Sequence, residues 1–261
     1  MTHIQLTKAG VDYPVIRSGS DRGRGVGDLL GGTIFKMNSR TFVRALDNIN
    51  LDLREGMRLG LIGNNGSGKS TLLRTLAGIL PLSRGTRTYS GKILTLFSTV
   101  AGIDLRLTGL ENVQRLAALH QLDTRRIPDV VEDIIDFTEL GDFFDLPVGT
   151  YSAGMRARFG FAFMTALEAD ILLIDEVIGA GDKRFHSKAE KRLETFTSAG
   201  GIIVVASHST AVLSALCTRA VVMRKGRIAF RGSVSKASAY FTTSEAGGVT
   251  GDDPSAEQPA A

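Results

Sequence analysis

The chain has 261 residues, a formal net charge of +4 at pH 7 and a single cysteine. This length is enough for one large α/β domain or two small ones. One cysteine excludes an internal disulfide and cannot form a metal site alone, a pattern typical of reducing, cytosolic proteins. The N-terminal residues show no apolar signal core, and no apolar run reaches the ~18 residues that suggest a membrane span. We therefore expect any membrane function to be shared with another chain.

The first part of the chain predicts two strands separated by an insertion. Residues 3–16 and 42–53 alternate apolar and polar side chains, the second in the manner of an edge strand. Residues 17–41 between them are rich in glycine and basic residues. We interpret them as a flexible surface insertion, with a contact loop for anionic lipid headgroups or a partner subunit as the alternative. RNA binding is disfavoured because no aromatic residues interleave the arginines of RGRG.

The next segment, GNNGSGKST, matches the pattern G-x-x-x-x-G-K-[ST] without a gap. An apolar strand-type run precedes it, and LLRTLAGIL follows with apolar residues at helical spacing, so the loop joins a strand to a helix. In this context the glycines turn backbone N–H groups around phosphates, and the helix N-terminus adds partial positive charge. Lys69 adds a full charge, and the Ser70 hydroxyl can ligate Mg²⁺. The predicted ligand is a nucleoside triphosphate, and its predicted contacts are Gly63, Asn64, Asn65, Gly66, Ser67, Gly68, Lys69, Ser70 and Thr71.

The rest of the chain alternates strands and helices after a turn marked by Pro81, Ser83 and Gly85. We expect strands at 92–97, 171–176 and 202–207, helices from about 100 to 163, near 188–197 and near Tyr240, and a hairpin at 221–230 with Gly226 in its turn. Continuous apolar strands that alternate with helices predict a mostly parallel sheet covered on both faces. Residues 242–261 are rich in Gly, Pro, Ala and acidic residues, which predicts a disordered tail after a domain of residues 1–241.

Two acidic residues end the strand ILLIDE at 171–176. Buried parallel strands deliver their last residues to the carboxyl edge of the sheet, where the glycine loop also lies. Asp175 can then hold Mg²⁺ through its hydration shell, and Glu176 can polarise the attacking water as general base. Strands often end in ordinary solvated acids, but the loop upstream favours a catalytic interpretation of this pair.

The segment TYSAGMRARFGFA, residues 150–162, resembles the signature of the nucleotide-binding subunit of ABC transporters, which is LSGGQ-like at this place. Ser152, Ala153 and Gly154 occupy the signature position, with Ala153 in place of a glycine and Met155 in place of the usual glutamine. A hydroxyl and a backbone N–H at a helix start can both be directed at a γ-phosphate. The resemblance implies that this phosphate belongs to ATP held by a second copy, so that a homodimer encloses two ATP molecules.

Other positions match the same family, and two depart from it. The resemblance implies that His208, directly after the strand at 202–207, contacts the γ-phosphate and orients the water, and that Asp182 crosses the dimer interface. The family's glutamine after the strand at 92–97 is absent, and Ser98 or Thr99 lies nearest. The unusual spacing made by residues 17–41 leaves two candidates for the aromatic residue that stacks on adenine, Tyr13 first and Phe42 second.

The resemblance covers about residues 3–241 and implies an α/β fold of the P-loop NTPase type, with a mostly parallel sheet, an antiparallel β part and an inserted helical subdomain at about 100–163. The segments GAGD (179–182) and LTGLENV (107–113) are similar to ATPases of ABC-2-type exporters of O-antigen, capsule, galactan or teichoic acid. This implies an ATP- and Mg²⁺-dependent subunit peripheral to the cytoplasmic side of the inner membrane. Its partners would be two copies of an integral membrane permease, and a lipid-linked glycan through that permease.

Three alternatives remain open. The exporter could carry another lipid, a glycolipid or a drug. A soluble ABC-type ATPase acting on nucleic acid or ribosomes is disfavoured, because only about eighty residues separate Lys69 from Ser152, too few for a long coiled coil, and the chain has one cassette. A catalytically inactive regulatory cassette is disfavoured because Lys69, Asp175, Glu176 and His208 are all present. We expect no nucleic acid partner.

Overall fold

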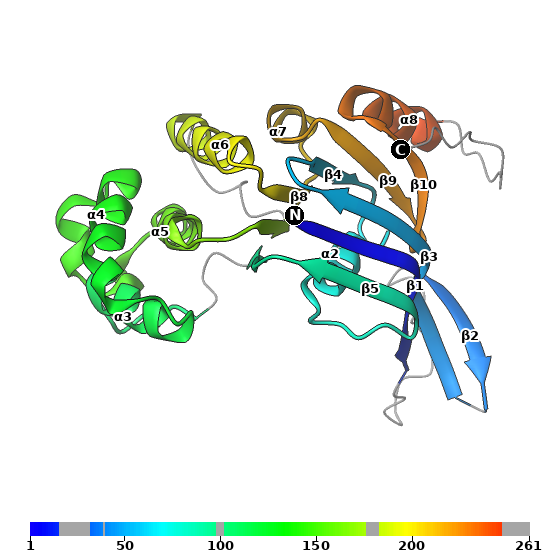
Figure 1. The fold of residues 1–261 in the computed structure, drawn as a ribbon, viewed down its shortest axis with the longest axis horizontal. Helices are drawn as coiled ribbons and strands as arrows, with labels where there is room; N and C mark the ends of the chain where they lie inside the picture. The colour runs from blue at the N-terminus through cyan, green and yellow to red at the C-terminus, as the bar shows by residue number, and fades with distance from the viewer. Residues whose placement is uncertain (16–31, 39, 98–101, 176–182, 247–261) are drawn as a thin grey trace.

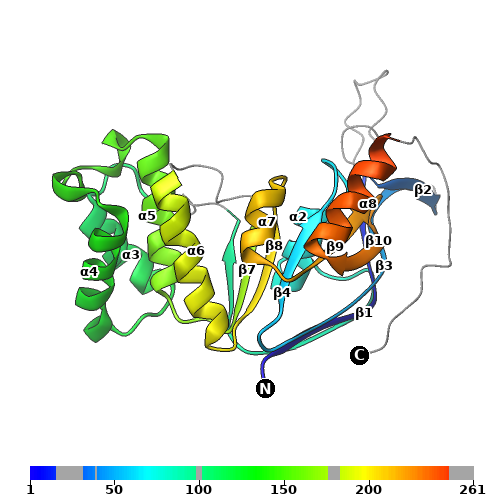
Figure 2. The same cartoon turned by 90° about the horizontal axis from the view of Figure 1, so that it is seen from above.

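The computed structural model describes residues 1–15, 32–38, 40–97, 102–175 and 183–246. The strands form two sheets, one of four strands and one of six (Figure 1). Three helices, α3 to α5, stand together at one end of the molecule, and strand β2 lies at the other end (Figures 1 and 2). In the part of the chain described, no helix combines the length and apolarity needed to cross a bilayer.

The four-stranded sheet is antiparallel and has the order β2-β3-β1-β5. Its strands are β1 (His3–Pro14), β2 (Thr33–Met37), β3 (Arg40–Arg54) and β5 (Arg84–Ser90). The edge character predicted for residues 42–53 fails only at 42–44, because within the described residues β2 pairs with β3 from Arg40 to Arg44, and the rest of β3 pairs with β1 alone. Strand β5 falls partly on a predicted turn. Six of its seven residues are exposed, so backbone pairing with β1, rather than apolar alternation, defines it.

The six-stranded sheet has the order β10-β9-β4-β8-β7-β6. Its strands are β4 (Arg58–Ile62), β6 (Ile93–Leu96), β7 (Ile171–Asp175), β8 (Ile202–Ala206), β9 (Arg219–Arg224) and β10 (Arg227–Ser233). The pairs from β9 to β6 are parallel, and β10 closes the sheet as an antiparallel hairpin partner of β9. The mostly parallel sheet and the hairpin are therefore confirmed, with Gly226 at a φ of 78° in the turn.

The central strand β8 shows why the core has two parts. All five of its side chains are buried. Ile202 and Val204 pack with helix α2 (Lys69–Ala77) and the antiparallel sheet, whereas Ile203 and Val205 pack in the cluster that contains the helical subdomain. Successive strand residues point to opposite faces, so a continuous apolar run fills both layers.

The remaining helices pack in the apolar cluster on the second face of the parallel sheet. The helical subdomain comprises α3 (Gly109–Leu119), α4 (Ile127–Thr138) and α5 (Ala153–Ala166), with short 3-10 turns at 124–126, 141–145 and 148–150. Helices α6 (Lys183–Ser198), α7 (Thr210–Leu216) and α8 (Val234–Ala246) follow along the chain. The helical character predicted for about 100–163 agrees with this arrangement.

The predicted start of a disordered tail at residue 242 is wrong for its first five residues, because α8 continues to Ala246. The composition of these residues predicts disorder, but packing of the helix against its neighbours stabilises it. Val234 and Ala237 are buried, and the Tyr240 ring stacks on Phe230 with centroids 4.7 Å apart. Residues 247–261 lie outside the described part of the chain.

Candidate nucleotide-binding site

The loop between β4 and α2 has a backbone that requires glycine at two positions. Gly63 has a φ of 153°, and Gly68, the residue that caps α2, has a φ of 108°. A Cβ on Gly63 would lie 2.5 Å from the Met223 carbonyl oxygen, and one on Gly68 would lie 3.1 Å from the Ala45 carbonyl oxygen. Larger residues would therefore push the loop away from its neighbours.

Backbone contacts hold the loop from behind. Gly226, in the β9–β10 turn, donates its N–H to the Ser67 carbonyl over 2.9 Å, and its own carbonyl accepts the N–H of Asp47 on β3 at 2.9 Å. Within the loop the Ser67 N–H donates to the Asn64 carbonyl over 3.1 Å. The loop is thus fixed to both sheets through main-chain hydrogen bonds, which leaves its other side for a ligand.

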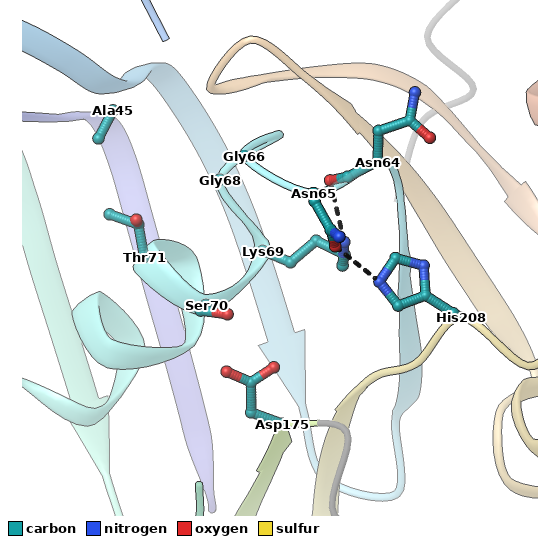
Figure 3. Close-up of a pocket in the computed structure, with 10 residues that line it drawn as sticks. All are labelled: Ala45, Asn64, Asn65, Gly66, Gly68, Lys69, Ser70, Thr71, Asp175 and His208. Atoms are coloured by element: carbon teal, nitrogen blue, oxygen red, sulfur yellow. Dashed lines mark hydrogen bonds between the residues drawn. The ribbon is translucent and has the colours of Figure 1, made fainter. Parts of the chain in front are cut away.

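Lys69, the first residue of α2, places its ammonium inside the loop. Its Nζ donates to the Gly63 carbonyl over 2.5 Å and to the Asn64 carbonyl over 3.1 Å, and the residue is only 8% exposed (Figure 3). A nearly buried charge at a helix N-terminus makes this region favourable for an anion. Phosphate oxygens can replace the two carbonyls as partners of the ammonium.

The pocket beside the loop brings together residues from three strand ends. Asp175 ends β7, and His208 follows β8 by two residues. Asp175 pairs with Ala206 in the parallel register, which places both groups at the same carboxyl edge as the loop. The residues that line the pocket are Ala45, Asn64, Asn65, Gly66, Gly68, Lys69, Ser70, Thr71, Asp175 and His208 (Figure 3).

His208 is connected to the loop directly. Its Nε2 lies 3.1 Å from Asn65 Oδ1, and the two groups can hydrogen bond when Nε2 carries the proton. This contact joins the end of β8 to the phosphate loop across the pocket. Of the predicted loop residues, Gly63 and Ser67 form the wall behind and do not line the pocket.

Ser70 and Asp175 give the pocket two oxygen donors. Figure 3 shows the Asp175 carboxylate directed toward the side of the pocket where Ser70 lies. Among the described residues no group of three or more His, Cys, Asp or Glu side chains could hold a metal by itself. This pattern fits Mg²⁺, which keeps several waters and is usually held by one or two protein groups together with substrate phosphates.

The signature residues lie outside this pocket. Ser152 caps α5, and its Oγ accepts the Met155 N–H over 3.2 Å. Ser152 and Ala153 are exposed, Gly154 is half-buried, and none of the three lines the pocket. Both views show α5 in the helical subdomain, apart from α2 (Figures 1 and 2). The chain therefore presents its signature away from its own phosphate loop.

Asn112, a fully buried residue that was not predicted from the sequence, holds the segment that contacts the residues before the signature. The Asn112 side chain donates to the carbonyls of Asp104, Leu107 and Thr108 over 2.9–3.1 Å and accepts the Asp104 N–H over 2.8 Å. The Leu107 carbonyl in turn accepts the Val148 N–H over 2.8 Å. The sequence could have indicated this role, because Asn112 is a polar residue beside the apolar positions of LENV. Ala45 and Glu245 were missed as well, Ala45 because its side chain carries no polar signal.

Several predicted positions lie elsewhere. Glu176, Asp182, Ser98 and Thr99 fall outside the described residues. Tyr13 is half-buried on β1 opposite Val43, packs at the border of the core between the two sheets and does not line the pocket.

The alternative aromatic residue, Phe42, is paired with other groups. It lies opposite Pro14 and stacks on Phe35 with ring centroids 5.6 Å apart. Adenine stacking by Tyr13 or Phe42 stays a prediction.

Comparisons with known proteins agree with this geometry. The model of the ABC transporter family matches residues 46–179. The O-antigen export system ATP-binding protein RfbE of Yersinia enterocolitica is 40% identical over 234 residues, which cover 87% of this chain and 97% of that protein. The teichoic acids export ATP-binding protein TagH of Listeria innocua is 36% identical over 184 residues, 70% of this chain and 55% of its own length. The chain thus spans about half of the TagH relative.

Solved structures share the fold. The dimeric structure of the ATP-binding cassette MJ0796 bound to ADP and Pi is 20% identical, covers 88% of this chain and has a TM-score of 0.69, with 98% of that chain covered. An ATP-binding subunit of an ABC transporter is 17% identical with a TM-score of 0.70, and the match covers 92% of this chain and 93% of that chain. The family match and the 40% identical relative show that this chain belongs to the ABC transporter family.

Proposed function

We propose that this chain is the ATP-hydrolysing subunit of an ABC exporter that moves a lipid-linked polysaccharide, O-antigen or a similar glycan, across the inner membrane. The observation that carries the proposal is the pocket that joins Lys69, Ser70, Asp175 and His208, while Ser152 faces elsewhere. The choice of cargo rests on the relatives, whose names describe O-antigen and teichoic acid export.

In this function the loop binds the phosphates of ATP. The Lys69 ammonium exchanges the Gly63 and Asn64 carbonyls for phosphate oxygens, and the N-terminus of α2 adds its partial charge. Ser70 and Asp175 would hold Mg²⁺, which neutralises charge on the β- and γ-phosphates when bound. Because only two protein side chains would hold Mg²⁺, the affinity of the site for the metal depends on bound nucleotide.

Hydrolysis requires a base and an oriented water. Glu176 follows Asp175 directly in the sequence and is the proposed general base. His208 is the proposed contact to the γ-phosphate, and its bond to Asn65 keeps the imidazole at the pocket until ATP is present. Asp175, the residue before Glu176, and His208 lie at the carboxyl ends of the adjacent strands β7 and β8.

A second copy completes each site in this proposal. The exposed Ser152 at the start of α5 offers a hydroxyl and free helix N–H groups to a phosphate outside its own chain. Asp182 is the proposed contact across the dimer. Two copies of an integral membrane permease form the path for the glycan, and this subunit binds them from the cytoplasmic side.

A complementation experiment tests the cargo. In a cell that lacks this subunit, we expect surface polysaccharide to disappear and lipid-linked glycan to accumulate inside, and the wild-type chain to restore export. Lys69→Ala should fail to restore it, because the loop loses its charge, while Lys225→Ala, in the neighbouring hairpin turn, serves as the exposed control. Normal surface polysaccharide in the deletion strain would favour another lipid, glycolipid or drug as cargo.

A further inference from the structure

Helix α8 contacts strand β10 and the start of α7, the helix that follows His208. Its first half packs through Val234 and Ala237, and the Tyr240 ring stacks on Phe230 at a centroid distance of 4.7 Å. On another side, Ser238 Oγ lies 3.4 Å from Thr210 Oγ1, at the start of α7 and two residues after His208. The helix is therefore attached to both β10 and α7 before its last turn begins.

The last turn of α8 reaches the phosphate loop. Glu245 Oε1 accepts a hydrogen bond from Asn64 Nδ2 over 2.9 Å. Arg224 at the end of β9 steadies this turn: its Nη2 donates to the Ser244 carbonyl over 3.0 Å and lies 3.7 Å from Glu245 Oε1. The contact joins residues 181 positions apart in sequence.

Asn64 connects this turn to the phosphate-binding groups. Its carbonyl accepts the Lys69 Nζ at 3.1 Å and the Ser67 N–H at 3.1 Å, and the residue lines the pocket while its side chain points away from Lys69 (Figure 3). A shift of Asn64 would thus move a partner of the lysine and the first turn of the loop together. The end of α8 is the element that holds the Asn64 side chain by a hydrogen bond.

We propose that Glu245 is a positioning residue of the nucleotide site and acts through Asn64. This inference rests on ATP binding at the loop, as proposed above. A loop whose amides are already arranged loses less conformational freedom when it binds phosphate, so fixing Asn64 favours binding. A carboxylate alone would repel a triphosphate, but Arg224 lies beside it and offsets the charge. The role is therefore that of a hydrogen-bond acceptor.

The size of the expected effect follows from exposure. Glu245 and Arg224 have side chains that are 43% and 37% exposed. A partly exposed hydrogen bond contributes little, so loss of this one should weaken ATP binding by about three- to tenfold. Because the reacting groups are untouched, the KM should rise while kcat changes less than twofold.

The experiment measures binding of a fluorescent ATP analogue, steady-state kinetics and thermal unfolding for the full-length chain. Glu245→Ala removes the acceptor, Glu245→Gln keeps an oxygen acceptor without the charge, and Thr243→Ala, exposed in the same turn, is the control. A double-mutant cycle with Asn64→Ala tests the connection, since coupled residues give non-additive effects. We expect Glu245→Ala to weaken binding in the wild-type background and to have no effect in the Asn64→Ala background.

The outcomes separate this inference from the proposed function. Normal binding by Glu245→Ala, tighter binding by it, or an equal loss in both backgrounds would overturn the positioning role. An equal loss for Glu245→Gln and Glu245→Ala would also overturn it, because the amide oxygen keeps the bond to Asn64. Absence of ATP binding by the wild-type chain would instead refute the nucleotide site itself.

Discussion

Asn112 provides the sharpest test of how the segment before the signature is held. The residue is fully buried, and its two amide hydrogens are shared among three backbone carbonyls, those of Asp104, Leu107 and Thr108. Its Oδ1 accepts the Asp104 N–H over 2.8 Å. Asn112→Ala would remove these side-chain partners; each of the three carbonyls keeps one backbone N–H, whereas the Asp104 N–H loses this acceptor.

The expected cost is roughly 2–4 kcal/mol, since each lost hydrogen bond contributes about 1 kcal/mol and the Asp104 N–H loses its side-chain acceptor. For a domain of this size that corresponds to a fall in Tm of about 5–12 °C. Urea denaturation measures it as a lower midpoint with an unchanged m-value. Gln114→Ala, on the exposed side of the same helix, should change the free energy of unfolding by less than about 0.5 kcal/mol.

The same substitution should act on catalysis through the signature. The loop that Asn112 organises accepts hydrogen bonds from Val148 and Gly149, just before Ser152. We therefore expect lower ATPase activity with unchanged ATP affinity in the monomer, because the phosphate loop lies elsewhere. An Asn112→Ala chain as stable as the Gln114→Ala chain would refute the hydrogen-bond argument.

Three further predictions concern other residues. Ser152→Arg should abolish turnover and leave ATP binding by the monomer intact; weaker binding by the monomer would contradict a role across the dimer. Glu176→Gln should trap ATP and elute as a dimer in size-exclusion chromatography, and a monomer that still hydrolyses ATP would exclude Glu176 as the base. Burial raises the pKa of the Cys217 thiol to about 12, from an ordinary value of 9.0. Its thiolate forms only in the unfolded chain between these pH values, so stability should fall as pH rises through that range, and Cys217→Ala should reduce the fall.

The phosphate loop could be predicted in full because its chemistry is contiguous. Nine neighbouring residues carry the glycines, the lysine and the hydroxyl, and the flanking strand and helix have clear apolar patterns. Asp175 and His208 could be placed beside it because buried parallel strands end at a common edge. Their positions at the ends of apolar strands were sufficient, and both residues line the pocket together with seven of the nine loop residues.

Other features depend on contacts that leave no local pattern. The conformation of β5 comes from pairing with β1, since none of its residues is buried. The composition after residue 242 predicts disorder, yet the Arg224 bond to the Ser244 carbonyl and the Glu245 bond to Asn64 hold the last turn of α8. Contacts between residues far apart in sequence decide these cases, and a single sequence does not display them.

The hydrogen bonds that hold the phosphate loop indicate where a conformational change on ATP binding can begin. Gly226 holds Ser67 through a main-chain hydrogen bond, and Glu245 holds Asn64 from the far side. Neither of these bonds involves a group that must contact phosphate. The His208 bond to Asn65 is different, because the same imidazole nitrogen that meets Asn65 is available to a γ-phosphate oxygen. We therefore expect the loop to keep its shape when ATP binds. The conformational change should start at His208 and pass to α7, which begins two residues later, and from α7 to α8 through the contact between Thr210 and Ser238.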